Sequence, residues 1–177
     1  LNQFPDGVWF VEFAPIVNSA LLPGVILSIF KLNDQPNKTT LETLQDYLQD
    51  MQVLLILDNC EHVIDSAAKL ALALLENSPR LEILATSREA LNVMGEIAWR
   101  LPSLSLPDIK RLPETADQLT QYEAVRLFIE RASLVSACFA VNKENAPAIA
   151  QICFHLDGIP LALELAETDL AAVLVEQ

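Results

Sequence analysis

The stretch LLILDN, residues 54–59, decides the fold class that the sequence predicts. Four branched aliphatic residues run directly into Asp58, a pattern typical of a buried parallel strand that delivers a carboxylate at its carboxyl end. Open α/β sheets bind their ligands at that end of the strands. The stretch therefore predicts a parallel sheet and a candidate site at Asp58.

Strands and helices alternate on both sides of this stretch. Apolar runs between turn signals predict strands over 8–14 and 81–86, and periodic apolar positions predict helices over 19–30 and 61–77. Another helix is expected to begin with a capping box of Thr39 and Glu42. Because such alternation builds parallel sheets, we expect an α/β fold. A short strand over Ile97–Leu101 is also expected, with Trp99 in a packed position.

The pattern changes after residue 101. Residues 102–118 carry prolines and little periodicity, which indicates a linker. The patterns beyond it are helical: Thr120 with Glu123 predicts a capping box, Asn142 predicts a second cap, and Gly158-Ile159-Pro160 predicts a turn between helices. We therefore expect an α/β domain over 1–101, a linker over 102–118 and an all-helical domain over 119–177.

Composition argues against several classes of protein. The formal net charge is −13, from 24 acidic and 11 basic residues, and an acidic surface repels a phosphate backbone, so direct nucleic-acid contact by this segment is not expected. Prolines interrupt the longest apolar stretch and no signal-peptide pattern is present, so no membrane segment is expected. The three cysteines form no C-x-x-C pair, which argues against structural zinc and fits a reduced, cytoplasmic setting. A nucleophilic pair of Cys60 and His62 is disfavoured because no orienting acid accompanies it.

Two candidate site residues follow neighbouring predicted strands, and each has two interpretations. Asp58 is either a ligand of Mg²⁺, through water, or the N-cap of the helix that begins near Glu61. Arg88 either reaches a terminal phosphate, which its guanidinium fork suits, or forms a surface ion pair with Glu61 or Glu89.

Several motifs, taken in order, resemble one family. The motifs are Phe4–Glu12 (FPDGVWFVE), Leu54–His62 (LLILDNCEH), Ile83–Glu89 (ILATSRE), Glu123–Arg131 (EAVRLFIER) and Leu156–Leu165 (LDGIPLALEL). They resemble the NB-ARC-like, STAND-class signal-transduction ATPases, also called AP-ATPases. The likeness is greatest to the nucleotide-binding domains of bacterial LuxR-type and SARP-type transcriptional regulators, and it runs from Phe4 to Glu167.

The resemblance implies an ATP/ADP-binding regulatory switch with a P-loop NTPase-like core and a small helical domain. It implies that Asp58 is the Walker B acid beside Mg²⁺, that Arg88 reads the terminal phosphate, and that Pro160 touches the adenine. It further implies a homo-oligomer in the ATP-bound state. The family's phosphate loop and winged-helix segments are the partners that this segment would be expected to have.

The sequence also departs from the family. No stretch reads G-x-x-x-x-G-K-[ST], and the family's phosphate-loop strand, a middle strand of its sheet, is missing, so we expect a gap in the sheet or strands that close up. Asn59 replaces the acid that often follows Walker B and is expected among the nucleotide-binding residues with Asp58, Arg88 and Pro160, while Glu61 is a candidate substitute base beside Asp58. We expect this chain alone to bind nucleotide poorly and to hydrolyse essentially none. The alternative is a degenerate scaffold or protein-interaction module; an independent hydrolase lacks an evident base and oxyanion site.

Overall fold

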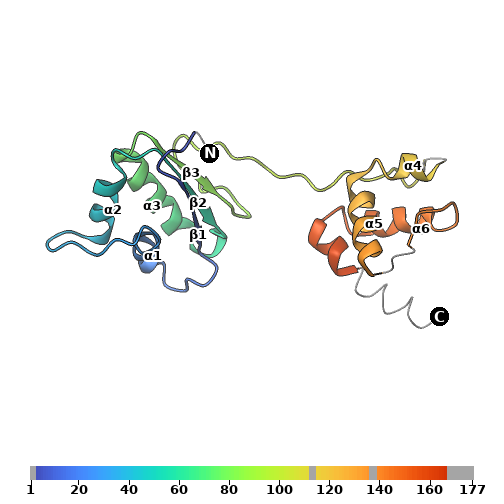
Figure 1. Ribbon diagram of the computed structural model, residues 1–177, viewed down its shortest axis with the longest axis horizontal. Coiled ribbons are helices and arrows are strands. Elements are labelled where there is room, and N and C mark those ends of the chain that lie inside the picture. Colours follow the sequence, from blue (N-terminus) through green and yellow to red (C-terminus); the bar gives the residue numbers. More distant parts are fainter. Residues whose placement is uncertain (1–2, 112–114, 136–138, 167–177) are drawn as a thin grey trace. The chain divides into compact units, whose positions relative to one another are not determined.

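Two compact units make up the chain, Leu1–Trp99 and Arg100–Gln177. The computed structural model describes residues 3–111, 115–135 and 139–166, and Figure 1 traces both units along the sequence. Each unit has its own cluster of buried apolar side chains. The units are therefore described one at a time.

In the described part of the first unit, three parallel strands form one sheet in the order β1-β2-β3. The strands are β1 (Val8–Glu12), β2 (Val53–Asp58) and β3 (Leu81–Ala85). All three were predicted from the sequence. Phe10 is in register with Ile56, and Ile56 with Leu84, so the carboxyl ends of the strands meet at one edge of the sheet.

The strands β2 and β3 pair directly with each other, with Leu57 opposite Ala85. Of the two arrangements expected for this sheet, a gap or strands that close up, the described strands adopt the second. The backbone amides along β2 are thus satisfied by its two neighbours, as buried backbone requires. The first unit is a small parallel α/β layer.

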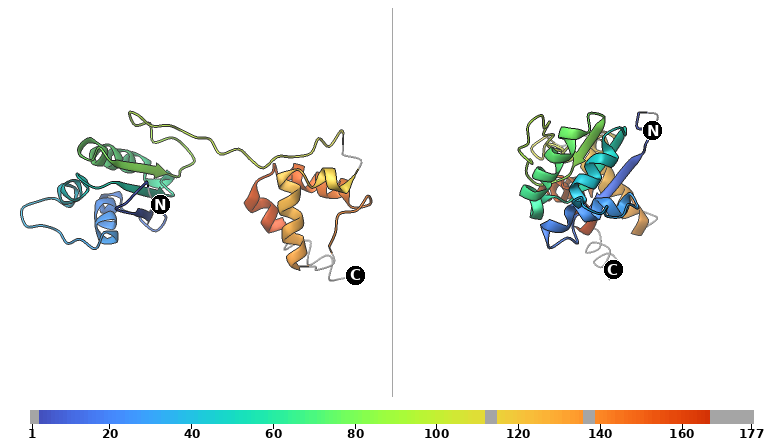
Figure 2. Two further views of the ribbon diagram at one scale, coloured as in Figure 1. Left: turned by 45° about the horizontal axis from the view of Figure 1, so that its top comes forward. Right: turned by 90° about the vertical axis from the view of Figure 1, so that its left-hand side faces the viewer.

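One face of the sheet is covered by helices α1 (Leu22–Ile29), α2 (Thr40–Leu48) and α3 (Ile64–Asn77), which pack on one another (Figures 1 and 2). The predicted capping box is present, because Thr39 Oγ1 accepts from the Glu42 amide and Glu42 accepts from the Thr39 amide. Buried side chains of these helices and of alternate strand residues form the core, among them Val11, Leu55, Leu57, Ile26, Leu44, Leu48, Ala67 and Leu74.

The opposite face of the sheet is more open. Phe10 and Leu84, which lie in the same register row, are 57% and 53% exposed. Between them Ile56 is partly buried, while its neighbours Leu55 and Leu57 on the helix-covered face are fully buried. The period-two burial along β2 thus separates a helix-covered face from a second, exposed apolar face.

The short strand expected over Ile97–Leu101 is absent from the structure, in which these residues have no regular secondary structure and lie outside the sheet. Trp99 is 83% exposed, so the prediction that it is packed was wrong as well. The turn before this segment is present: Gly95 has a φ of +84° and the Glu96 amide bonds the Val93 carbonyl. In the described part of the chain this segment pairs with no strand, although β1 and β3 are the edge strands of the sheet.

The regular secondary structure described in the second unit is all helical. It contains α4 (Ala116–Leu119), α5 (Glu123–Val135), α6 (Ala146–His155) and a further helix that begins at Pro160 and is described over 160–166. Its core consists of Leu119, Ala124, Val125, Phe128, Ile149, Ala150, Cys153 and Leu163. No helix in the described part of the chain combines the length and apolar character that spanning a bilayer requires.

The predicted capping box of Thr120 and Glu123 was wrong. Thr120 Oγ1 donates to the carbonyl of Asp117 instead. Ser105 caps α5: its hydroxyl accepts from the Glu123 amide at 2.9 Å, and the Glu123 carboxylate accepts from the Ser105 amide at 3.1 Å. These two bonds lower the pKa of Glu123. Residues 104–106, inside the expected linker, thereby join the helical unit, where Leu104 and Leu106 pack on the core.

Candidate functional site

Asp58 ends β2 and lies half-buried at the carboxyl edge of the sheet. Its Oδ1 accepts a hydrogen bond from the hydroxyl of Thr86 at 2.5 Å, and Thr86 directly follows β3. Asp58 does not cap the following helix, because that turn has Cys60 at its N-cap and no side-chain cap bond. Of the two interpretations of Asp58, the capping role is therefore wrong.

Thr86 connects the two strand ends. Its amide bonds the Leu57 carbonyl and its carbonyl accepts from the Cys60 amide, so β3 stays paired past its last strand residue. Besides donating to Asp58, its hydroxyl accepts from the Asn59 amide at 3.0 Å. Sequence reasoning assigned Thr86 no role. The available signal was its place, the first polar residue after a strand that neighbours β2.

Asn59 turns the chain away from the sheet edge. Its φ of +62° is in the left-handed region, which asparagine tolerates better than most residues. In the amide orientation that satisfies both of its polar atoms, the side-chain nitrogen donates to both carboxylate oxygens of Glu61, at 2.8 and 2.9 Å. The residue that follows the candidate metal ligand thus holds a second carboxylate in place.

Arg88 forms an ion pair with that carboxylate. Its Nε lies 3.1 Å from Glu61 Oε1. The Arg88 side chain is 86% exposed while that of Glu61 is 21% exposed, so a fixed acid anchors an arginine that faces solvent. Of the two surface partners considered for Arg88, Glu61 and Glu89, the structure shows Glu61, and a contact of Arg88 with a phosphate stays a prediction.

Cys60 and His62 serve structural contacts in this part of the chain. The Cys60 thiol is fully buried against the Leu57 carbonyl, and burial, with a smaller contribution from Glu61 and Asp58, raises its pKa to about 11. A thiol in that setting is a poor nucleophile at neutral pH. His62 Nε2 lies 3.0 Å from the carbonyl of Ile16, which ties the loop after β1 to the end of β2.

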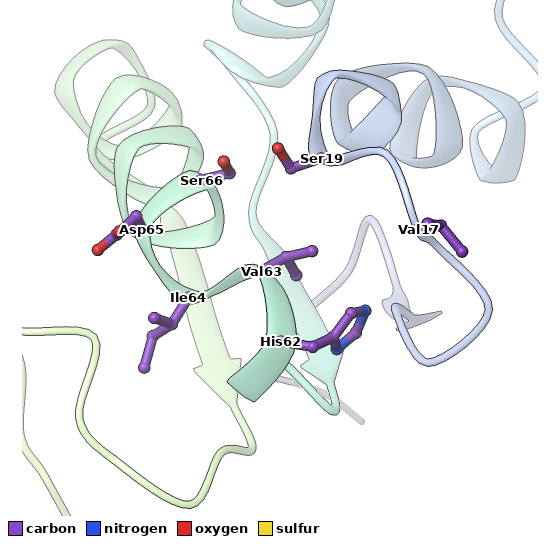
Figure 3. A pocket seen from close by; sticks show the side chains of 7 residues that line it. All are labelled: Val17, Ser19, His62, Val63, Ile64, Asp65 and Ser66. Atoms are coloured by element: carbon purple, nitrogen blue, oxygen red, sulfur yellow. The ribbon is translucent and has the colours of Figure 1, made fainter.

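An open depression of about 220 Å³ lies next to His62. Figure 3 shows its lining: Val17, Ser19, His62, Val63, Ile64, Asp65 and Ser66. The His62 ring is directed toward the loop that carries Val17, whereas Asp65 and Ile64 point away from it. The hydroxyls of Ser19 and Ser66 could bind a small polar group, but the depression is shallow.

The remaining predicted site residue, Pro160, belongs to the second unit. There Asp157 and Gly158 have φ of +52° and +62° and end α6, and Pro160 is exposed at the start of the next helix. The predicted Gly-Ile-Pro turn is confirmed, and the contact of Pro160 with adenine stays a prediction.

The charged groups at the sheet edge include the carboxylates of Asp58 and Glu61, the second of them engaged by Arg88, and the guanidinium of Arg88. Among the described residues no group of three or more His, Cys, Asp or Glu could hold a metal ion. Asp58 could therefore contribute one protein oxygen to a hydrated Mg²⁺, an ion that keeps several waters in such sites. Arg88 could contribute a planar fork for a phosphate oxygen pair.

Known proteins resemble this chain over most of its length. A Mycobacterium tuberculosis (strain H37Rv) protein named "Putative HTH-type transcriptional regulator" is 41% identical over 165 residues, which cover 93% of this chain and 17% of that protein. A Mycobacterium bovis protein named "Putative HTH-type transcriptional regulator" shows the same identity and coverage. An uncharacterized protein of Mycobacterium bovis is 37% identical over 165 residues, 38% of its length. No protein-family model matches the chain, which spans less than half of each of these relatives.

Proposed function

We propose that this chain is the core of a nucleotide-dependent regulatory switch in a transcription regulator of several domains. The regulatory part of the proposal is supported by relatives named as HTH-type regulators. The nucleotide part is supported by the resemblance of the sequence motifs to NB-ARC-like, STAND-class ATPases. The expected ligands are ATP and ADP with Mg²⁺.

One observation carries the nucleotide part: Asp58 ends β2 and Arg88 follows the adjacent parallel strand β3, at the same edge of the sheet. Thr86 joins the two strand ends by its side chain and its backbone. This edge is where open α/β sheets bind ligands. A carboxylate for Mg²⁺ and a guanidinium for phosphate on this edge match the two charges of a magnesium–nucleotide complex.

In this proposal each residue contacts or supports a different part of the ligand. Asp58 holds hydrated Mg²⁺ and Arg88 contacts the terminal phosphate. Asn59 hydrogen-bonds Thr86 and Glu61 and so supports both charged groups. The contact of Pro160 with adenine rests on the resemblance of the sequence motifs alone. Hydrolysis would be slow, because Asn59 cannot act as a base and Glu61, the other candidate, is engaged with Arg88.

A degenerate scaffold is the second candidate function. The observation that favours it is the Glu61–Arg88 ion pair, which gives the arginine a partner within the chain without any ligand. No Gly-x-x-x-x-Gly-Lys-Ser/Thr stretch occurs in the chain, so it carries no such cradle for the β and γ phosphates. A scaffold would keep the fold and bind protein partners instead.

Calorimetry with Mg-ATP and Mg-ADP separates the two candidates. We expect binding by the full natural chain that carries this sequence, and little by residues 1–177 alone. Failure of both chains to bind would favour the scaffold.

A matched pair of variants, made in the chain that binds nucleotide, then tests the site. Thr86→Val removes the hydroxyl that holds Asp58 and should weaken Mg-ATP binding about ten-fold, the lower end for losing a second-layer partner of a metal ligand. Thr86→Ser keeps the hydroxyl and should bind within about two-fold of wild type. Equal binding by both variants would count against Asp58 as the Mg²⁺ ligand.

A further inference from the structure

A continuous series of hydrogen bonds joins the two charged groups of the candidate site. Asp58 accepts from Thr86, Thr86 accepts from the Asn59 amide, and the Asn59 side chain donates to Glu61. Glu61 in turn accepts from Arg88 Nε. Neither Asn59 nor Glu61 is needed for the strands to pair, so this polar series calls for an explanation of its own.

The edge of the Arg88 guanidinium that Glu61 contacts shows whether Glu61 would compete with a phosphate for the arginine or orient the arginine toward it. Only the Nε edge of the guanidinium contacts Glu61, and the structure shows no hydrogen bond from the Nη atoms to any residue that it describes. A competitor for the arginine would occupy the forked face that a phosphate needs. An orienting partner would bind the opposite edge and leave the Nη pair free, as the structure has it.

Glu61 is itself well fixed for this task. Asn59 donates to both of its oxygens, and its side chain is mostly buried. A mobile, exposed arginine loses side-chain freedom when it binds a ligand, and a fixed acid lowers that cost by limiting its orientations beforehand.

We propose that Glu61, held by Asn59, is the positioning residue that orients Arg88 toward the terminal phosphate of the bound nucleotide. The inference rests on the proposed function and deepens it. By orienting the arginine that contacts the terminal phosphate, Glu61 makes the site bind the triphosphate more tightly than the diphosphate. The same engagement removes Glu61 from the role of catalytic base that the sequence suggested.

The test is a double-variant cycle in the natural protein that carries this sequence, with Mg-ATP and Mg-ADP affinities measured by calorimetry. The variants are Glu61→Ala, Arg88→Gln and the two combined. Glu61→Ala should lower the ratio of ATP to ADP affinity about three- to ten-fold, within the range of losses for removed supporting residues. Arg88→Gln should lower it at least as much, and the combination should add nothing further.

Two control variants keep the result interpretable. Glu61→Gln retains an acceptor for Arg88 Nε and should recover part of the lost ratio. Asp65→Asn removes a nearby acidic charge whose side chain points away from His62, as Figure 3 shows, and should leave the ratio unchanged. Unchanged ADP affinity in all variants reports that the site is still folded.

Other outcomes would overturn the inference. Tighter ATP binding by Glu61→Ala would make Glu61 a competitor of the phosphate, and an unchanged ratio with lost hydrolysis would make it a base. An effect of Glu61→Ala that persists in the Arg88→Gln background would show that it does not act through the arginine. If the wild-type protein binds neither nucleotide, the proposed function fails and takes this inference with it.

Discussion

Cys60 lies buried directly behind the candidate site, between Asn59 and Glu61. Burial raises its pKa to about 11 from an ordinary 9.0. At pH 8 the fraction of Cys60 present as thiolate is therefore about one-hundredth of that of an ordinary cysteine. The double variant Cys138→Ser, Cys153→Ser leaves Cys60 as the one thiol of the chain. We expect a thiol-specific reagent to react with Cys60 at least ten-fold more slowly in the folded protein than in the same protein unfolded in urea. Stopped-flow absorbance measures the rate.

The same group also affects stability at high pH. Because the folded pKa is the higher one, its contribution to folding is fully present below about pH 9 and is lost as the pH rises toward about 11. Cys60→Ala should remove this part of the alkaline destabilisation. Reaction at pH 8 as fast as in urea would contradict the buried position of the thiol.

At the level of single residues, the sequence predicted which charged residues lie at the site better than it predicted the hydrogen bonds and the ion pair that join them. Asp58 and Arg88 could be found because each follows an apolar strand pattern. The bond between Thr86 and Asp58 could not, because it joins residues 28 positions apart and depends on which residues of β2 and β3 lie opposite one another. The choice between Glu61 and Glu89 as partner of Arg88 was open for the same reason.

Of the four glycines, Gly158 is the one at which an added Cβ would come nearest to another atom. Gly158 has a φ of +62°, and a Cβ at this position would lie 2.5 Å from the carbonyl oxygen of Leu104. The Leu104 amide also bonds the Gly158 carbonyl at 3.0 Å. The turn after α6 therefore holds residues 104–106 against the helical unit, and it has no space for a side chain.

We expect Gly158→Ala to destabilise the helical unit by about 1–3 kcal/mol, the cost of one strained backbone conformation, with the steric overlap adding to it. Gly24→Ala is the matched control, because Gly24 lies in the first turn of α1 with an ordinary φ and nothing within 4 Å of the added Cβ. It should leave stability unchanged or raise it by less than about 1 kcal/mol. Urea unfolding followed by circular dichroism measures both; equal stability of the two variants would show that the turn can relax.

Elements with local signals were predictable and elements with distant partners were not. The Thr39–Glu42 capping box spans three residues and is present as predicted. The cap of α5 comes from Ser105, eighteen residues before Glu123, so no local motif could reveal it. The apolar alternation over Ile97–Leu101 resembles a strand, but pairing needs a neighbouring strand, which a local pattern does not provide.

The whole molecule is organised around two separate cores, one in the α/β unit and one in the helical unit. The sequence predicted the change of pattern after residue 101, and the structure divides its two units between Trp99 and Arg100. The exposed apolar face of the sheet, with Phe10 and Leu84 about half exposed, was not predictable. Its aliphatic strands indicated burial on both faces, as parallel sheets usually have.

Separate cores predict separate responses to core mutations. Leu55→Ala removes a fully buried side chain of β2, and Leu163→Ala removes a fully buried side chain of the helix over 160–166. Each should destabilise its own unit by about 2–5 kcal/mol, the usual cost of such a truncation. In scanning calorimetry of the chain we expect two transitions, with each variant lowering a different one.

The exposed leucine Leu165 provides the control for this experiment. It lies two residues from Leu163 on the same helix and is 60% exposed, so Leu165→Ala should change stability much less than Leu163→Ala, because little apolar surface is lost from a packed core. A single transition that both core variants lower by the same amount would mean that the two cores unfold as one cooperative unit. Two transitions that respond separately would mean that a ligand held by Asp58 and Arg88 raises the transition of the first unit directly.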